Sequence, residues 1–152
     1  MGARMLLRIL VVPLLFAISG ATAGQPDPSR IPVIDATDRA SLLEHLDRHV
    51  IVAGTVASAR WSRTGKVMNI EFEGSEGGER AGLLAVVFES RRGAFDAAWN
   101  GAFTKAIAGR RVRLHGQLNE YGGYDEAQKG RPQMILNVPD QVTLVDAGTG
   151  SG

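Results

Sequence analysis

Two groups of cationic and aromatic side chains have the residue types of a ligand-binding site. The first group surrounds a turn at residues 62–65, and the second lies in and just after a polar segment at residues 121–130. Aromatic rings stack on nucleobases and cations contact phosphates, so the mixture is typical of sites for single-stranded nucleic acid. Aromatic residues at strand ends also serve packing, which leaves a structural role open. The candidate nucleic-acid-binding residues are Arg60, Trp61, Arg63, Lys66, Tyr121, Tyr124, Lys129 and Arg131.

Metal binding and catalysis have less support. His45 and His49 are four apart in a predicted helix, but the run His-Leu-Asp-Arg-His lacks the glutamate of a zinc-protease motif, and no third ligand is evident. Glu71 and Glu73 lie two apart in a predicted strand, where solvated carboxylates are the ordinary interpretation. The sequence has no Gly-x-Ser-x-Gly elbow, no phosphate loop and no cysteine. We therefore expect no catalytic residues, no metal and no cofactor, and a protein that is not an enzyme.

The hydrophobic pattern predicts the elements that position these residues. Residues 111–118 alternate between apolar and polar types, which indicates a half-exposed strand. Phe95, Trp99, Phe103 and Ile107 recur every four residues, which indicates one helix with an aromatic stripe. A helix over 35–49 and strands at 50–61, 66–73 and 83–89 precede it, and a loop at 121–130 and a last strand from Pro132 follow.

This order predicts a mainly β domain with a five-stranded Greek-key OB-fold barrel. A helix between the third and fourth strands is the layout of that barrel, and the aromatic stripe suits a plug for the barrel end. Gly54 and Gly116 are expected where long strands coil sharply. The predicted OB-fold domain also has an N-terminal helix. A split α+β sheet is the alternative fold, and it accounts less well for the two glycines.

The predicted faces of two strands bear on the ligand. On the strand at 66–73, Met68, Ile70 and Phe72 are expected to point inward and Val67, Asn69, Glu71 and Glu73 outward. On the strand at 83–89, Leu84, Val86 and Phe88 are assigned inward and Leu83, Ala85 and Val87 outward. The outward set is apolar with two carboxylates, which suits a protein partner, a covering helix or a neutral ligand better than a phosphate chain. The predicted core is Met68, Ile70, Phe72, Val86, Phe88, Val112, Leu114, Met134 and Leu136.

Residues 1–23 have the pattern of a secretory signal peptide. Arg4 and Arg8 flank the apolar run at residues 9–18, which is too short for a bilayer of ~30 Å, and Ala21-Thr22-Ala23 offers small residues for cleavage. Without Arg4 and Arg8, the 17 Lys/Arg become 15 against 16 Asp/Glu, a formal charge of −1. A near-neutral domain has no overall field for capturing phosphates.

We therefore expect an exported protein, periplasmic or secreted, with no stable membrane insertion after cleavage. A linker and lead-in at residues 24–34, an OB-fold domain at 35–146 and a disordered tail at 147–152 complete the expected organisation.

Four segments carry a resemblance to a known family. They are GKVMNIEFEG (65–74), LLAVVFES (83–90), GRRVRLHGQLNEYGG (109–123) and RPQMILNVPDQV (131–142). Together they resemble the OB-fold domain found in bacterial secreted proteins and beside the nuclease domains of some extracellular multidomain nucleases. The likeness covers roughly residues 45–145 and implies a domain that resembles nucleic-acid-binding modules. The chain departs from the pattern by the insertion YDEAQKG at 124–130.

Two functions follow as hypotheses. One is an exported OB-fold module that binds single-stranded nucleic acid or a similar polyanion through the loops at 62–65 and 121–130. The alternative is an accessory interaction domain that binds a protein partner through the outward face of the second and third strands.

Overall fold

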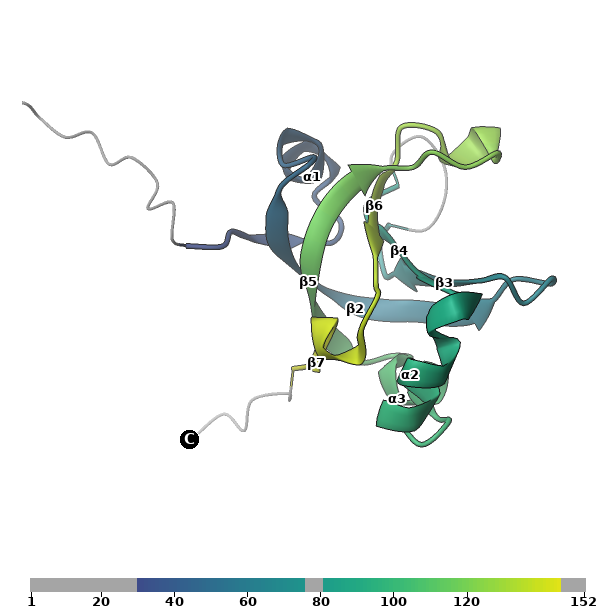
Figure 1. Cartoon of the computed structure of the whole chain (residues 1–152). Helices are drawn as coiled ribbons and strands as arrows, with labels where there is room; N and C mark the ends of the chain where they lie inside the picture. The colour runs from purple at the N-terminus through teal and green to yellow at the C-terminus, as the bar shows by residue number, and fades with distance from the viewer. Residues whose placement is uncertain (1–29, 76–80, 146–152) are drawn as a thin grey trace, which may run out of the picture.

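The computed structural model describes residues 30–75 and 81–145. The predicted signal peptide, most of the linker and the tail lie outside these residues. Figure 1 shows a β-barrel with short helices at both ends. The strands are β1 (Val33–Asp35), β2 (His49–Trp61), β3 (Val67–Phe72), β4 (Leu84–Phe88), β5 (Arg111–Glu120), β6 (Pro132–Ile135) and β7 (Val142–Leu144). The helices are α1 (Arg39–Glu44), α2 (Arg92–Ala98) and α3 (Phe103–Ile107), with 3-10 turns η1 (Glu89–Arg91), η2 (Glu126–Gln128) and η3 (Pro139–Gln141).

The long strand β2 closes the barrel because it pairs with two different strands. Its first half, His49 to Thr55, is antiparallel to β5, and its second half, Val56 to Trp61, is antiparallel to β3. The remaining pairings run β3–β4, β4–β6 and β6–β5, so five strands form a closed ring. This connectivity, with helices between the third and fourth barrel strands, is an OB fold and confirms the predicted architecture.

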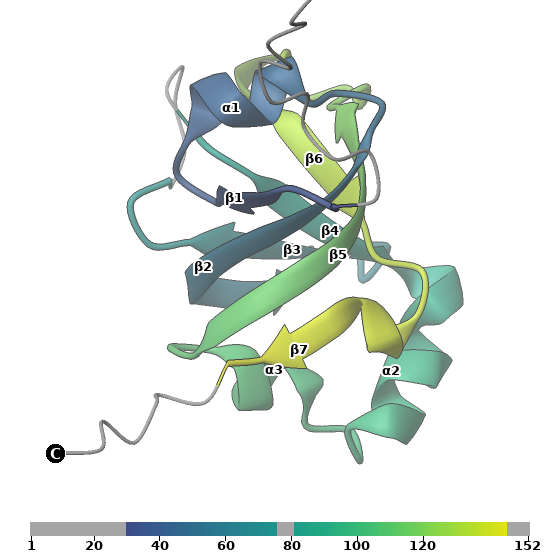
Figure 2. The same ribbon diagram turned by 90° about the vertical axis from the view of Figure 1, so that its left-hand side faces the viewer.

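Two short strands extend the ring on one side. Strand β1 is parallel to β2, and β7 is antiparallel to β5. The predicted last strand is therefore interrupted by η3: β6 pairs with the end of β5 and belongs to the ring, and β7 pairs with the start of β5, on the side of β5 away from β2. Figure 2 shows β1, β2, β5 and β7 side by side, with α1 at one end of the barrel and α2 and α3 at the other.

Gly54 and Gly116 lie at the places where long strands change partner. Gly54 comes two residues before β2 passes from β5 to β3, and Gly116 comes shortly before β5 passes from β2 to β6. Both are buried and crowded: a Cβ on Gly54 would lie 2.7 Å from the Ala36 Cβ, and one on Gly116 would lie 3.2 Å from the Met134 sulfur. Glycine permits the backbone approach that this curvature brings about.

Two helices take the place of the single helix predicted around the aromatic stripe. The helix is interrupted at Asn100 and Gly101, whose φ angles of 51° and 73° are in the left-handed region. Phe95 of α2 and Phe103 of α3 are nonetheless both buried, with ring centroids 4.9 Å apart, and close the barrel end as expected. The N-terminal helix is also shorter than predicted, since Asp38 caps it through Ser41 N and it ends at Glu44.

The assignment of faces on β4 was wrong. Ala85 and Val87 point into the core, whereas Leu84, Val86 and Phe88 lie on the outer side, and Phe88 is 43% exposed rather than buried. The other predicted core residues, Val86 included, are buried. The error has a physical cause. The outer side of β4 lies beneath a loop, and the strand is apolar on both sides. Its sequence therefore shows no alternation of apolar and polar residues from which the faces could be assigned. No helix in the described ranges is long and apolar enough to cross a bilayer.

Candidate functional site

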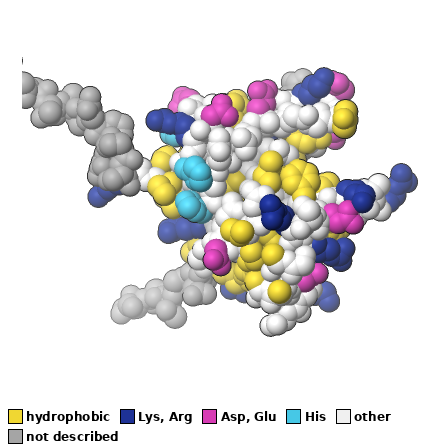
Figure 3. All heavy atoms as spheres, viewed as in Figure 1, with side chains coloured by type: hydrophobic (Ala, Val, Ile, Leu, Met, Phe, Trp, Pro, Cys, Tyr) yellow, Lys and Arg dark blue, Asp and Glu magenta, His cyan; other side chains and the backbone are white. Residues whose placement is uncertain are grey.

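A cleft of about 430 Å³ lies over the outer side of β3 and β4. The segment between β5 and β6 forms its opposite wall. In the view of Figure 3, apolar side chains are visible between this segment and the projecting β2–β3 hairpin. The cleft is lined by Val67, Asn69 and Glu71 of β3, Leu84, Val86 and Phe88 of β4, Tyr121, Gly122, Gly123, Asp125 and Gln128 of the wall segment, and Gln133 of β6.

The floor of the cleft is apolar because of the strand periodicity. Alternate residues of β3 and β4 point out of the barrel, and those of β4 are the aliphatic side chains of Leu84 and Val86, followed by Phe88. The ring of Phe88 offers an exposed aromatic surface of the kind that anchors ligands.

The polar groups of the cleft are amides and carboxylates. Asn69, Gln128 and Gln133 each carry both donors and acceptors, and Glu71 and Asp125 contribute negative charge. Asp125 also accepts a hydrogen bond from Ala127 N at 3.0 Å, which fixes the start of η2. None of the described residues that line the cleft is a lysine or an arginine.

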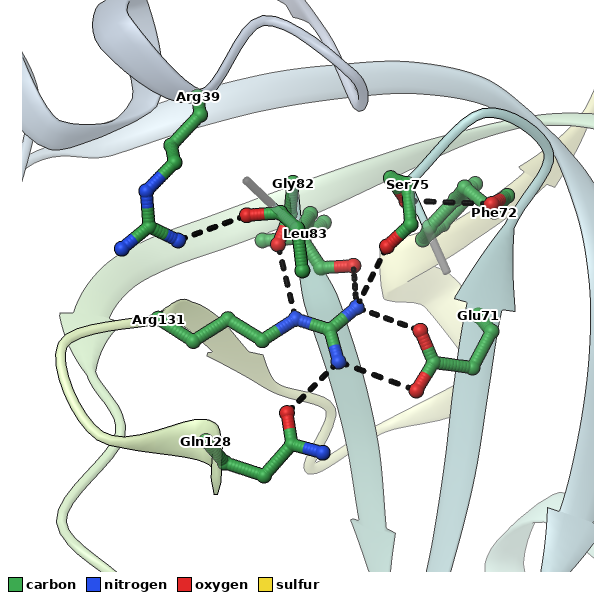
Figure 4. Close-up of polar contacts among 9 residues, drawn as sticks. Arg39, Glu71, Phe72, Ser75, Gly82, Leu83, Gln128 and Arg131 are labelled. Atoms are coloured by element: carbon green, nitrogen blue, oxygen red, sulfur yellow. Dashed lines mark hydrogen bonds and ion pairs between the residues drawn. The ribbon is translucent and has the colours of Figure 1, made fainter. Parts of the chain in front are cut away.

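Arg131 fixes one end of the cleft from below. Its side chain is only 2% exposed, and its guanidinium makes a bidentate ion pair with Glu71. It also donates to Gln128 Oε1 at 2.8 Å and to the carbonyl oxygens of Gly82, Ser75 and Leu83 at 3.0, 3.1 and 3.3 Å (Figure 4). Since Glu71 and Gln128 line the cleft, Arg131 holds two of its walls in a defined geometry.

Arg39 fixes the same region from α1. Its guanidinium donates to Ala81 O at 2.7 Å and to Gly130 O at 3.0 Å. The two arginines thus form hydrogen bonds with the segment that precedes β4 and with the segment that precedes β6. We infer that the cleft exists before any ligand arrives.

The sequence-predicted site residues divide into three positions. Arg60, Trp61, Arg63 and Lys66 all lie at the tip of the β2–β3 hairpin, where Figure 3 shows Lys and Arg side chains beside a carboxylate. Tyr121 lines the cleft, whereas Tyr124 is fully exposed. Arg131 does not lie on the loop surface as expected. Its guanidinium is buried, and Glu71, Gln128 and backbone carbonyl groups near the start of β4 surround it.

Several of these cations already have partners. The Lys66 Nζ lies 2.7 Å from Glu89, and this hydrogen bond, with the charge of Glu89, raises the pKa of Lys66. The Lys129 Nζ lies 2.6 Å from Glu126. Trp61 is half-buried and carries the Arg92 guanidinium 4.8 Å from its ring centroid. Arg60 and Arg63 are exposed at the same tip.

The histidines do not form a larger ligand cluster in the described parts of the chain. His45 Nδ1 lies 2.7 Å from Ser41 O, and the rings of His49 and His115 lie 5.8 Å apart. No group of three His, Cys, Asp or Glu side chains suited to a metal is found within residues 30–75 and 81–145.

Sequence reasoning missed Phe88, Gln128 and Gln133 as cleft residues. The outward parity of β3 identified Asn69 and Glu71 correctly. Gln133 could have been found from its place between Pro132 and Met134, since Met134 was assigned to the core and its neighbour must face out. Gln128 lies in an irregular loop, for which periodicity carries no signal.

Comparisons with known proteins identify similar folds but no family. No protein-family model matches the chain, and no curated protein matches it. An asparaginyl-tRNA synthetase of Entamoeba histolytica has a similar structure with 13% identity and a TM-score of 0.48, over 76% of this chain and 24% of that chain. An aspartyl-tRNA synthetase of Leishmania major aligns with 10% identity and a TM-score of 0.45, over 81% of this chain and 22% of that chain.

A third similar structure is an OBody bound to hen egg-white lysozyme. It aligns with 19% identity and a TM-score of 0.45, over 67% of this chain and 85% of that chain. The chain spans about a quarter of the length of the two synthetases or less. Similarity at this level concerns the fold alone, and the ligand has to be argued from the site.

Proposed function

We propose that the protein is a non-catalytic OB-fold binding module whose cleft over β3 and β4 takes an extended, uncharged or basic polypeptide segment of a partner protein. The observation that carries this proposal is the composition of the cleft: an apolar floor, an amide and carboxylate rim, and no cationic lining residue. Such a lining attracts apolar and positively charged groups and repels a phosphate chain.

The cleft offers an extended peptide both anchoring and hydrogen bonding. Phe88, with Val67 beside it, gives an apolar contact for one partner side chain. The amides of Asn69, Gln128 and Gln133 can pair with the backbone N–H and C=O groups that an extended chain exposes. Asp125 stands at the rim, where a lysine or arginine of the partner would find a carboxylate.

A random-peptide display library panned against the domain tests this proposal. Binding peptides should share an apolar residue and a basic residue, and their amide shift perturbations should map to Asn69, Phe88 and Gln133. Phe88→Ala should weaken binding at least tenfold, about 1.4 kcal/mol, because an aromatic anchor is lost. Leu43→Ala, which truncates an exposed side chain of α1 outside the cleft, serves as the control. Equal affinity of the Phe88→Ala variant would refute the proposal.

A second candidate function, binding of single-stranded nucleic acid, is favoured by the hairpin tip. Arg60 and Arg63 are exposed there, beside Trp61 and the Arg92 guanidinium above it. A single strand would place phosphates on these cations, with Tyr124 and Tyr121 as stacking residues toward the cleft. Arg131 takes no part in this candidate, because it is buried, and Lys66 and Lys129 would first have to leave Glu89 and Glu126.

A salt series with dT and rU dodecamers tests the second candidate. Affinities near the ~10⁻⁴–10⁻⁶ M of non-specific binding are expected, with little sequence preference. Replacement of Arg60 and Arg63 by glutamine should reduce the salt slope by about 2. The pair Arg48→Gln and Lys105→Gln, two exposed cations elsewhere, makes the same change in net charge. If no oligonucleotide binds at low salt, the hairpin is not a nucleic-acid site.

We also propose that residues 1–23 direct export and are removed. The support is the apolar run at residues 9–18 with its arginine flank and the small residues before Gly24. Intact-mass measurement of the protein recovered outside the cytoplasm should give a chain that begins at Gly24. An exported chain that retains Met1 would contradict cleavage.

A further inference from the structure

A second surface of distinct charge lies on the side of the barrel away from the cleft. It is the outer face of the sheet formed by β1, β2, β5 and β7, which faces the viewer in Figure 2. Along β5 the burial alternates strictly, so that Val112 and Leu114 fill the core while Arg111, Arg113 and His115 are exposed. None of these three residues lines the cleft.

Strand β2 adds a second imidazole to this face. His49 of β2 is exposed, and its ring lies 5.8 Å from that of His115. Arg113 is exposed and is paired in register with Ala53, a small residue. Asp35 of β1 is an acidic residue on the outer face of these strands. It accepts hydrogen bonds from Thr37 N and Thr37 Oγ1 at 2.9 and 2.6 Å, and its charge interacts with that of Arg111 at the start of β5.

The spacing of the cations matches one kind of partner. Alternate residues of a strand stand about 6.8 Å apart, so β5 presents two guanidinium groups and one imidazole in a straight row with that repeat. An extended polypeptide with acidic residues at alternate positions has the same repeat. Guanidinium groups also form bidentate pairs with carboxylates.

The same face suits other polyanions less well. A single-stranded nucleic acid needs aromatic platforms for its bases. The outward residues of β1, β5, β7 and the part of β2 that pairs with β5, residues 49–55, include no Phe, Tyr or Trp. A membrane surface needs bulky apolar side chains that insert. On the described strands of this face, only Val33 and the half-buried Ile51 could serve that purpose.

We propose that this basic sheet face docks an acidic polypeptide segment in extended conformation, with its carboxylates along Arg111, Arg113 and His115. The surface is separate from the cleft, so the protein would bind two partners of opposite character on two sides. This inference does not depend on what occupies the cleft.

The probe is a labelled decapeptide of alternating Glu and Thr, followed by fluorescence anisotropy with the mature chain. A second peptide with five consecutive Glu and five consecutive Thr has the same charge without the repeat. The alternating peptide should bind more tightly, and amide shifts should map to β5 and β2. The variant Arg111→Gln/Arg113→Gln should lose about tenfold in affinity. The variant Arg60→Gln/Arg63→Gln, with the same change in charge at the hairpin, should lose little.

Several results would overturn the proposal. Equal binding of the two peptides would remove the role of the strand repeat. Equal losses in the two arginine variants would indicate attraction by net charge alone. Tighter binding of a dT decamer or of phosphatidylserine vesicles through Arg111 and Arg113 would assign the face to a different class of partner. Phe88→Ala should leave binding of the acidic peptide to the β1, β2, β5 and β7 face unchanged. A failure of the cleft proposal can therefore be distinguished from a failure of this one.

Discussion

Arg131 holds a positive charge where water is excluded, and oxygen atoms from four separate parts of the chain surround it. Glu71 supplies a carboxylate, Gln128 an amide oxygen, and the stretches around Ser75 and Leu83 supply carbonyls. No buried side-chain nitrogen or oxygen in the described residues lacks a partner. A buried ion pair of this kind contributes little over an apolar replacement, but removal of one partner is costly because the other charge remains buried.

We expect Arg131→Met to lower the free energy of unfolding by about 3–5 kcal/mol. The carboxylate of Glu71 would lose its counterion and three carbonyl groups would lose their donor. Urea unfolding of this variant, with Arg110→Met as the exposed control, measures the loss. The double variant Arg131→Met/Glu71→Leu should recover part of it, and additive losses would show that the two residues are not coupled.

Asp35, just before α1, makes a pH-dependent contribution to the stability of the fold. Hydrogen bonds from the Thr37 hydroxyl and backbone lower the pKa of Asp35, with a smaller contribution from the charge of Arg111. The stabilisation is therefore present above the ordinary Asp pKa of ~3.9 and is lost as the pH falls through the lower folded value. Thr37→Val should flatten the pH dependence of stability below about pH 4. Unchanged acid-unfolding curves would contradict this.

At the scale of elements, periodicity decided what could be predicted. Strands β3 and β5 alternate between apolar and polar residues, and both faces were assigned correctly from sequence. Strand β4 is apolar throughout, since a loop covers its outer side, and its assignment was inverted. Arg131 follows a glycine in a polar loop, so nothing local indicates that its charge is buried. The pairing with Glu71 spans 60 residues and is visible only in three dimensions.

The helix pair α2 and α3 gives a prediction with an internal control. Phe103 is 2% exposed and packs on Phe95 and Trp99, whereas Phe88 is 43% exposed on the cleft floor. Phe103→Ala should cost about 3–5 kcal/mol through the cavity that it leaves. Phe88→Ala should cost less than about 1 kcal/mol while it weakens ligand binding. Thermal and urea unfolding measure the loss of unfolding free energy in each variant. Equal losses in the two variants would show that Phe103 does not plug the barrel end.

At the scale of the whole molecule, strand β2 closes the barrel and bends at Gly54, where the neighbouring side chains are in close contact with the backbone. A Cβ at Gly54 would lie 2.7 Å from the Ala36 Cβ and 2.8 Å from Phe72 Cδ1. We expect Gly54→Ala to destabilise the protein by about 1–3 kcal/mol through overpacking. Gly93→Ala, in α2 with open space around it, should instead be stabilising by about 0.4–1 kcal/mol. Calorimetry of both variants tests whether closure depends on Gly54.

Barrel closure also sets the order in which the chain can fold. Residues 49–55 pair with residues 111–117, and Glu71 meets Arg131 60 positions later in the chain. A nascent chain that ends before residue 111 exposes the apolar inner sides of β2, β3 and β4 with no partner to cover them. Folding is therefore expected to wait for the last third of the chain, and contacts this distant in sequence make it slow. Such a chain stays unfolded for a long time after synthesis begins, and during that interval its apolar segments are accessible to chaperones and to other copies of the chain.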